Sequence, residues 1–140
     1  MNVKIANKRE ELEHAYQVRM NVFVDEQHVP AEEELDEHDA TAIHFVAYDN
    51  EKPIAASRLR FVEEYGKLER ICVLKEYRGH SHGKYMILEM EKVITDKGYK
   101  KAKLNAQTHA EAFYKKLGYE TVSGEFLDAG IPHVTMIKEL

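Results

Sequence analysis

Apolar residues recur along the chain with two different periods, and these periods predict the order of its helices and strands. Spacings of three and four predict helices at about 8–22 and 82–97, and a shorter one at 110–117. Gly98 and Gly118 are typical helix stops. The second helix is predicted to pack on a sheet through Met86, Ile87, Met90, Val93 and Ile94.

Runs rich in β-branched and aromatic residues predict the strands. Three of them, at 44–49, 54–62 and 67–74, are joined by short turns and predict an antiparallel meander. Residues 23–39 are predicted to form a loop with room for one short helical turn. This order predicts an α/β (α+β) fold with a mixed, mostly antiparallel sheet flanked by helices. The other predicted strands are 3–5, 103–107, 125–127 and 134–138.

The composition is that of one globular domain spanning residues 1–140. The 20 basic and 25 acidic residues give a net charge of −5, which argues against nucleic-acid binding because that function usually requires a basic excess. No apolar run reaches the roughly 20 residues that span a bilayer, and the N-terminal residues lack a signal-peptide core. We therefore expect a cytoplasmic protein without membrane contact.

The most informative motif lies at residues 68–84. It is predicted to form a buried strand, a turn with two glycines and a serine, and the beginning of an amphipathic helix. A helix N-terminus presents unpaired N–H groups and a partial positive charge. Glycine lets the backbone approach a ligand closely, so this turn suits a phosphate or pyrophosphate.

Two motifs resemble the GNAT superfamily of acetyl-CoA-dependent N-acetyltransferases. The first matches the family pattern Gln/Arg-x-x-Gly-x-Gly/Ala at Arg78, Ser81 and Gly83, with serine in place of the middle glycine. A serine fits there if its φ is negative, and its hydroxyl could cap the helix or donate to phosphate. The second motif is Phe-Tyr-x-x-x-Gly-Tyr at residues 113–119, which follows a predicted strand. Two such motifs in the family order are more specific than either alone.

The resemblance covers essentially the whole chain, and residues 18–27 and 126–133 are similar to the small bacterial ElaA-like branch. It implies that the fourth strand splays from the fifth and that acetyl-CoA, without a metal, enters the gap as co-substrate. The N–H of Val73 would then stabilise the oxyanion. Asn105 would hydrogen-bond the pantetheine arm, or would only cap the strand end. The cofactor-binding residues implied in this way are Ile71, Cys72, Val73, Arg78, Gly79, His80, Ser81, His82, Gly83, Lys84, Asn105 and Tyr114.

Tyr114 is the expected general acid, because the departing thiolate needs a proton that a phenol can supply. Its alternative role is that of a core residue, like Phe113 beside it. Glu69 is the expected base, acting through water. Strand alternation places Glu69 on the same face as Ile71 and Val73.

The alternative for Glu69 is an ion pair with Arg58, Arg60 or another basic residue on a neighbouring strand. His109 and His133 are the other possible bases, since imidazole is suited to proton transfer. Either histidine could instead lie at a loop or strand end with no chemical role.

Arg19, Phe23 and His133 are the residues expected to shape the acceptor pocket. For Arg19, a structural pair with the acidic residues 32–39 is the alternative. Those acidic residues are interpreted as a solvated face, although they would suit a cationic amine if they border the cleft.

His80 and His82 do not indicate a metal site, because no third ligand lies at a recognised spacing. Cys72 is the only cysteine, so no disulfide can form within one chain. We interpret it as a buried, inert thiol and not as an acetyl carrier.

These observations predict direct transfer of acetyl from acetyl-CoA to a primary amine, on a small molecule or a peptide, in a ternary complex. The alternative is a non-catalytic module that binds CoA or acyl-CoA as a sensor or partner subunit. A nucleic-acid or membrane partner is not expected. The sequence leaves a monomer and a homodimer equally open.

Overall fold

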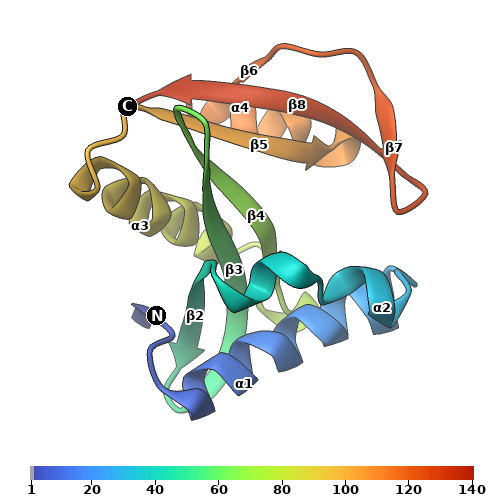
Figure 1. Cartoon of the computed structure of the whole chain (residues 1–140). Helices are drawn as coiled ribbons and strands as arrows, with labels where there is room; N and C mark the ends of the chain where they lie inside the picture. The colour runs from blue at the N-terminus through green and yellow to red at the C-terminus, as the bar shows by residue number, and fades with distance from the viewer. Residues whose placement is uncertain (1) are drawn as a thin grey trace.

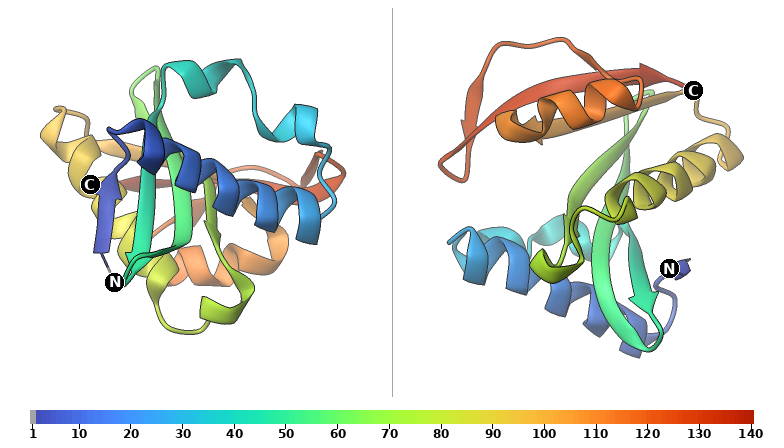
Figure 2. Two further views of the ribbon diagram at one scale, coloured as in Figure 1. Left: turned by 90° about the horizontal axis from the view of Figure 1, so that it is seen from below. Right: turned by 180° about the vertical axis from the view of Figure 1, so that it is seen from behind.

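A computed structural model describes residues 2–140, whose strands form one sheet with helices on both faces (Figures 1 and 2). The strands are β1 (Asn2–Ile5), β2 (Ile43–Asp49), β3 (Lys52–Val62), β4 (Tyr65–Val73), β5 (Lys101–Gln107), β6 (Glu120–Thr121), β7 (Phe126–Asp128) and β8 (Ile131–Glu139). The α-helices are α1 (Arg9–Arg19), α2 (Ala31–Glu34), α3 (His82–Asp96) and α4 (Glu111–Lys116). The other helical segments are the π-helix η1 (Met20–Glu26) and the 3₁₀ turns η2 (Glu37–Ala40), η3 (Lys75–Tyr77) and η4 (Thr108–Ala110).

The strand order is β1-β2-β3-β4-β5-β8-β6, and β7 pairs with β8. Strands β2, β3 and β4 form the predicted antiparallel meander. The pairing of β4 with β5 is parallel, whereas every other pairing described within residues 2–140 is antiparallel. The predicted mixed, mostly antiparallel sheet is therefore confirmed.

The two faces of the sheet bury separate apolar clusters. Helix α1 covers one face, and helices α3 and α4 cover the other (Figure 2). The predicted apolar face of α3 is confirmed, since four of its five residues are fully buried: Met86, Ile87, Met90 and Ile94. No helix within residues 2–140 is long and apolar enough to cross a membrane.

Strands β4 and β5 pair only at their first ends, from Tyr65 opposite Lys101 to Leu68 opposite Leu104. At Gly66, a Cβ atom would lie 2.4 Å from Cγ1 of Ile94 in α3, so this paired end requires glycine. Beyond Leu68 the two strands diverge (Figure 1). The predicted splay between the fourth and fifth strands is thus confirmed.

The segment between α1 and β2 departs most from prediction. The helix predicted to end near residue 22 continues to Glu26 as η1. Two further short helices, α2 and η2, follow where a loop with one short helical turn was predicted. Both are four residues long, which is too short to reveal a helical period. The η2 turn is instead set by a local cap, in which the Asp36 carboxylate accepts from the His38 N–H at 2.9 Å.

Candidate active site

A cavity of about 900 Å³ lies where β4 and β5 part. Its walls come from η1, α4, the first turn of α3, the β7–β8 turn and the acidic loop, residues 32–39. All of the predicted cofactor residues line the cavity except His80, which is exposed outside it. Tyr114, Glu69, Phe23 and His133 also line it, whereas Arg19 does not.

Val73 lies at the end of β4 with its backbone groups directed into the gap. The Leu74 N–H donates to the Ile54 carbonyl at 2.9 Å, and Val73 is the register partner of Ala55. In an antiparallel ladder this makes Ala55 and Val73 a non-hydrogen-bonded pair, whose N–H and C=O groups point away from the partner strand. Because β5 pairs with β4 no further than Leu68, the Val73 N–H faces the cavity, and no neighbouring strand accepts a hydrogen bond from it.

A β-bulge at Arg70 determines where the Glu69 side chain lies. Arg70 has a φ of 57°, and the register between β3 and β4 shifts there. On one side of the bulge Glu69 is opposite Arg58, and on the other side Cys72 is opposite Ala56. Since Ala56 and Arg58 share one face of β3, Glu69 and Cys72 share the face covered by α1.

Glu69 therefore lies on the opposite face from Ile71 and Val73, and the alternation predicted for these three residues is wrong. The additional residue in β4 reverses the alternation, which a regular strand would have kept. Ile71 and Val73 pack against the core cluster beneath α3, as their apolar side chains require. Glu69 faces the acidic loop.

Three cationic side chains contact the Glu69 carboxylate. Its oxygens lie 2.7 Å from Nη2 of Arg58, 3.1 Å from Nη1 of Arg60 and 3.1 Å from Nζ of Lys67. Burial opposes the charge of this carboxylate, but Arg58 and Lys67 outweigh that cost and lower its pKa below the usual value. The ion pair considered as the alternative role of Glu69 is present, and a carboxylate held in this way is a weak proton acceptor.

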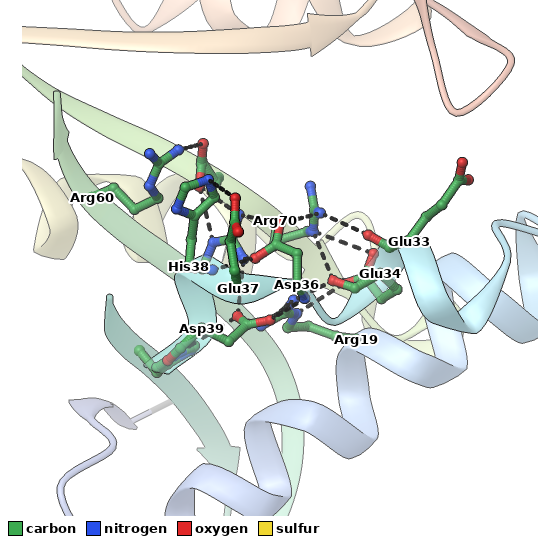
Figure 3. Close-up of polar contacts among 12 residues, drawn as sticks. Arg19, Glu33, Glu34, Asp36, Glu37, His38, Asp39, Arg60 and Arg70 are labelled. Atoms are coloured by element: carbon green, nitrogen blue, oxygen red, sulfur yellow. Dashed lines mark hydrogen bonds and ion pairs between the residues drawn. The ribbon is translucent and has the colours of Figure 1, made fainter. Parts of the chain in front are cut away.

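Two further arginines hold the acidic loop in place (Figure 3). Arg19 is 0% exposed and its guanidinium lies 2.8 Å from a Glu34 oxygen and 2.7 Å from an Asp39 oxygen. Its predicted contact with the acceptor is therefore corrected: Arg19 is a structural partner of the loop. Arg70 donates to the Glu34 backbone carbonyl at 3.3 Å and contacts Asp36, which ties the loop to the bulge.

The turn before α3 contains a second departure from prediction. Ser81 has a φ of 65°, in the left-handed region, and its side chain makes no capping hydrogen bond. The negative φ that would let a serine fit without strain is therefore not met, because the chain reverses into α3 at a position where a glycine would be favoured. Gly79, with a φ of 85°, has no atom within 4 Å of where its Cβ would be, and so leaves the turn open.

The Arg78 side chain leaves the turn and braces the end of β4. Its Nη1 and Nη2 each lie 2.7 Å from a carboxylate oxygen of Glu26 in η1, and its Nε donates to the Val73 carbonyl at 2.9 Å. The Glu26 carboxylate raises the pKa of Arg78. Arg78 thus connects η1 to the strand end that carries the Val73 N–H.

Tyr114 packs against the core and also lines the cavity. Its ring packs in the core, edge-on to Phe113 at 5.1 Å and to Tyr119 at 6.0 Å between centroids. Its residue lines the cavity, and within residues 2–140 its hydroxyl has no hydrogen-bond partner. Burial raises the pKa of the phenol to about 12, so it carries its proton at neutral pH.

Polar residues of β5 and β8 line the cavity from the α1 face. Ala106 and Val134 point into the core on the α3 side, so the residues that flank them point the other way. The Asn105 side-chain carbonyl accepts from the Thr135 hydroxyl at 2.9 Å, which leaves its NH₂ group for the cavity. His133, 9% exposed, donates from Nδ1 to the Ile131 carbonyl, 2.6 Å away.

A hydrogen-bonded pair of glutamines lines the cavity and was not singled out from the sequence as functional. The Gln107 Nε2 of β5 donates to Oε1 of Gln27, the residue after η1, at 2.9 Å. The Gln107 Oε1 also lies 2.7 Å from His109 Nε2. Gln107 could have been found from the sequence, because it lies two residues after Asn105 in the same predicted strand and so shares its face. Nothing in the sequence places Gln27 next to β5.

Cys72 has the inert character predicted for it. It is 5% exposed, and burial raises the pKa of its thiol to about 12. A thiol that holds its proton so firmly is a poor nucleophile. Within residues 2–140, no three His, Cys, Asp or Glu side chains form a group that could hold a metal ion.

Comparisons with known proteins agree with this geometry. The model of a family described as "Acetyltransferase (GNAT) domain" matches residues 7–140. The uncharacterized N-acetyltransferase YjcF of Bacillus subtilis (strain 168) is 51% identical over 140 residues, covering 99% of this chain and 100% of that protein. Escherichia coli ElaA is similar in structure, with a TM-score of 0.90 and 25% identity over 99% of this chain and 100% of that one. An acyl-CoA N-acyltransferase from Pseudomonas aeruginosa has a TM-score of 0.85 and 25% identity, covering 98% of this chain and 97% of that one.

Proposed function

This chain belongs to the acetyltransferase (GNAT) domain family, and from that premise we propose that it transfers acetyl from acetyl-CoA to a primary amine while both substrates are bound. The observation that carries the proposal is the direction of the Val73 backbone. Its N–H opens into a cavity between two parted strands. A fixed N–H in such a site stabilises negative charge that develops on a carbonyl oxygen.

The residues of the cavity fit acetyl-CoA, which when bound would supply an acetyl group activated as a thioester. The edge of β4 beyond Leu68 and the NH₂ group of Asn105 are available to an extended arm that carries amides. The open turn around Gly79 and the N-terminus of α3 suit its phosphates. Lys84, exposed in the first turn of α3, lies on the same side of the cavity.

Tyr114 is proposed as the general acid that returns a proton to the departing sulfur. Its hydroxyl has no competing partner within residues 2–140, and its raised pKa keeps the proton on the oxygen until a basic thiolate forms. It lies on α4, at the opposite face of the sheet from the acidic loop.

The acceptor is proposed to be a cationic amine, on a small molecule or a peptide. Glu32 and Glu33 of the acidic loop and Asp128 at the end of β7 line the cavity. Within the described residues their carboxylates form no ion pair, in contrast to Glu34 and Asp36. The Glu33 side chain extends away from the arginines that hold the loop (Figure 3). A primary amine is protonated at neutral pH, so these carboxylates would attract it.

The proposal is tested by measuring thiol release from acetyl-CoA across a panel of mono- and diamines and lysine-containing peptides. Val73→Pro removes the N–H without removing a ladder bond to β3, and we expect it to lower kcat by about 10²- to 10³-fold. Val73→Ala keeps the N–H and is the matched control. If calorimetry shows that the wild type binds CoA but no amine causes thiol release, the alternative of a non-catalytic CoA-binding module is favoured.

A further inference from the structure

We propose that His133 is the proton acceptor for the attacking amine, an inference that rests on the proposed function and specifies its base. His133 lies on β8, opposite Gln107 of β5 and Phe126 of β7. It lines the cavity and is 9% exposed.

The hydrogen bond of His133 determines which ring nitrogen is basic. Its Nδ1 lies 2.6 Å from the Ile131 carbonyl oxygen, and a carbonyl can only accept. The hydrogen of the neutral ring is therefore on Nδ1, and the lone pair is on Nε2. Stacking on the Phe126 ring, at 6.0 Å and 24°, fixes the plane of the imidazole. Within residues 2–140, Nε2 has no hydrogen-bond partner.

The other candidate bases are less suitable. Each Glu69 oxygen already contacts a cation, and that charge lowers the pKa of the carboxyl. His109 is exposed, and its Nε2 lies 2.7 Å from the Gln107 side-chain oxygen, so this nitrogen is the donor. His133 combines burial, a fixed tautomer and a free lone pair.

The position of His133 also matches the direction from which an amine would approach. His133 and Gln107 lie on the α1 face of the sheet, since their neighbours Ala106 and Val134 point into the α3-side core. The acidic loop lies on that same face, whereas Tyr114 comes from α4 on the other face. Base and acid thus reach the gap from opposite sides, so that His133 can serve the amine while Tyr114 serves the departing thiolate.

The proton transfers balance in the following way. The ammonium gives one proton to His133 Nε2, and the freed nitrogen lone pair forms the C–N bond to the acetyl carbon. The C–S bond breaks, and its electron pair takes the Tyr114 proton to give the free thiol. The nitrogen's second surplus proton restores the Tyr114 phenol, and His133 releases its proton to solvent. One acetamide, one thiol and one solvent proton result.

The first test compares His133→Gln with the control His28→Gln, because His28 is exposed and outside the cavity lining. Both are assayed with the amine that gives the fastest thiol release. We expect His133→Gln to lower kcat by about 10²- to 10⁴-fold and to leave coenzyme A affinity unchanged. His28→Gln should resemble wild type in both measurements. In His133→Ala, added imidazole should restore turnover in proportion to its concentration, which a structural role would not produce.

The second test does not depend on activity. Long-range ¹⁵N–¹H NMR of the wild type should show the hydrogen of neutral His133 on Nδ1, and Nε2 should shift when the amine is added. Wild-type turnover in His133→Gln, or a hydrogen on Nε2, would overturn the proposal. If neither variant binds coenzyme A, the position of the His133 hydrogen in the NMR spectrum of the wild type decides whether the proposal stands. If none of the amines causes the wild type to release thiol, the proposed function fails and this inference fails with it. If the wild type and His133→Gln are both active, only the role of His133 is removed.

Discussion

The proposed role of Tyr114 depends on its hydroxyl group alone. In Tyr114→Phe the ring and its edge-on contacts with Phe113 and Tyr119 remain, while the hydroxyl is lost. Because this hydroxyl has no hydrogen-bond partner within residues 2–140, its loss should change the free energy of unfolding by less than about 1 kcal/mol. If it is the general acid, kcat should fall by about 10²- to 10⁴-fold while coenzyme A affinity is retained.

Assays of thiol release measure the effect on kcat, and calorimetry on the same preparations measures the effect on coenzyme A affinity. Tyr85→Phe is the control, since Tyr85 is 54% exposed on α3 and outside the cavity lining. Equal turnover in wild type and Tyr114→Phe would remove this phenol from the mechanism. Because the pKa of Tyr114 is raised to about 12, its ionisation should not appear in the pH–rate profile below about pH 10.

At the scale of the element, the turn before α3 concentrates its strain in one residue. Ser81 adopts a φ of 65°, and Gly79, two residues earlier, adopts 85°. A left-handed conformation costs a residue with a Cβ atom roughly 1–2 kcal/mol. We therefore expect Ser81→Gly to leave the free energy of unfolding unchanged or to raise it by up to about 1 kcal/mol, with coenzyme A binding preserved.

Gly79→Ser is the matched reverse change and should lower the free energy of unfolding by about 1 kcal/mol, although space exists for the side chain. Urea unfolding of both variants measures the two effects on one scale. A loss of stability in Ser81→Gly would mean that the serine hydroxyl holds the turn through contacts other than a helix cap.

The elements that the sequence predicts well are those with a long apolar period. Helix α3 and strands β2 to β4 were located to within two residues, because burial on one face imposes a repeat on each. Helix α2, turn η2 and strand β6 contain at most four residues, and no period can develop over that length. Their conformations depend instead on contacts such as the Asp36 cap and the Arg70 bonds to the loop backbone.

At the scale of the whole molecule, the gap between β4 and β5 was implied by family resemblance and not by periodicity. A pattern of apolar residues shows that β4 is a strand, but it does not show where pairing with β5 ends. The bulge at Arg70 is equally invisible in the pattern, and it moved Glu69 to the other face of the sheet. Most predicted cofactor residues nevertheless line the cavity, because they follow from one contiguous strand, turn and helix.

The buried ion network that joins the acidic loop to the sheet makes stability depend on pH. Burial opposes the charges of Asp36, Asp39 and Glu69, but Arg58 and Arg19 outweigh this and lower their pKa values. The stability that these groups contribute is complete above the unfolded-state pKa of a carboxyl, about 4, and is lost as the pH falls through their folded-state pKa values. Burial raises the pKa of Glu34, so its contribution has the opposite sign and is lost as the pH rises.

With three lowered carboxyls against one raised, the unfolded state binds more protons in acid, and the free energy of unfolding should rise between about pH 3 and 5. Asp36→Asn removes one of the three and should make this rise shallower, at a cost of about 1–3 kcal/mol near neutral pH. Glu37→Gln is the control, because the Glu37 side chain is 86% exposed and its contact within residues 2–140 is with His38. Urea titrations at several pH values measure the slopes. An Asp36→Asn slope equal to that of wild type would show that Arg58 does not hold the Asp36 charge in the folded protein, and the network would then anchor the loop by hydrogen bonding alone.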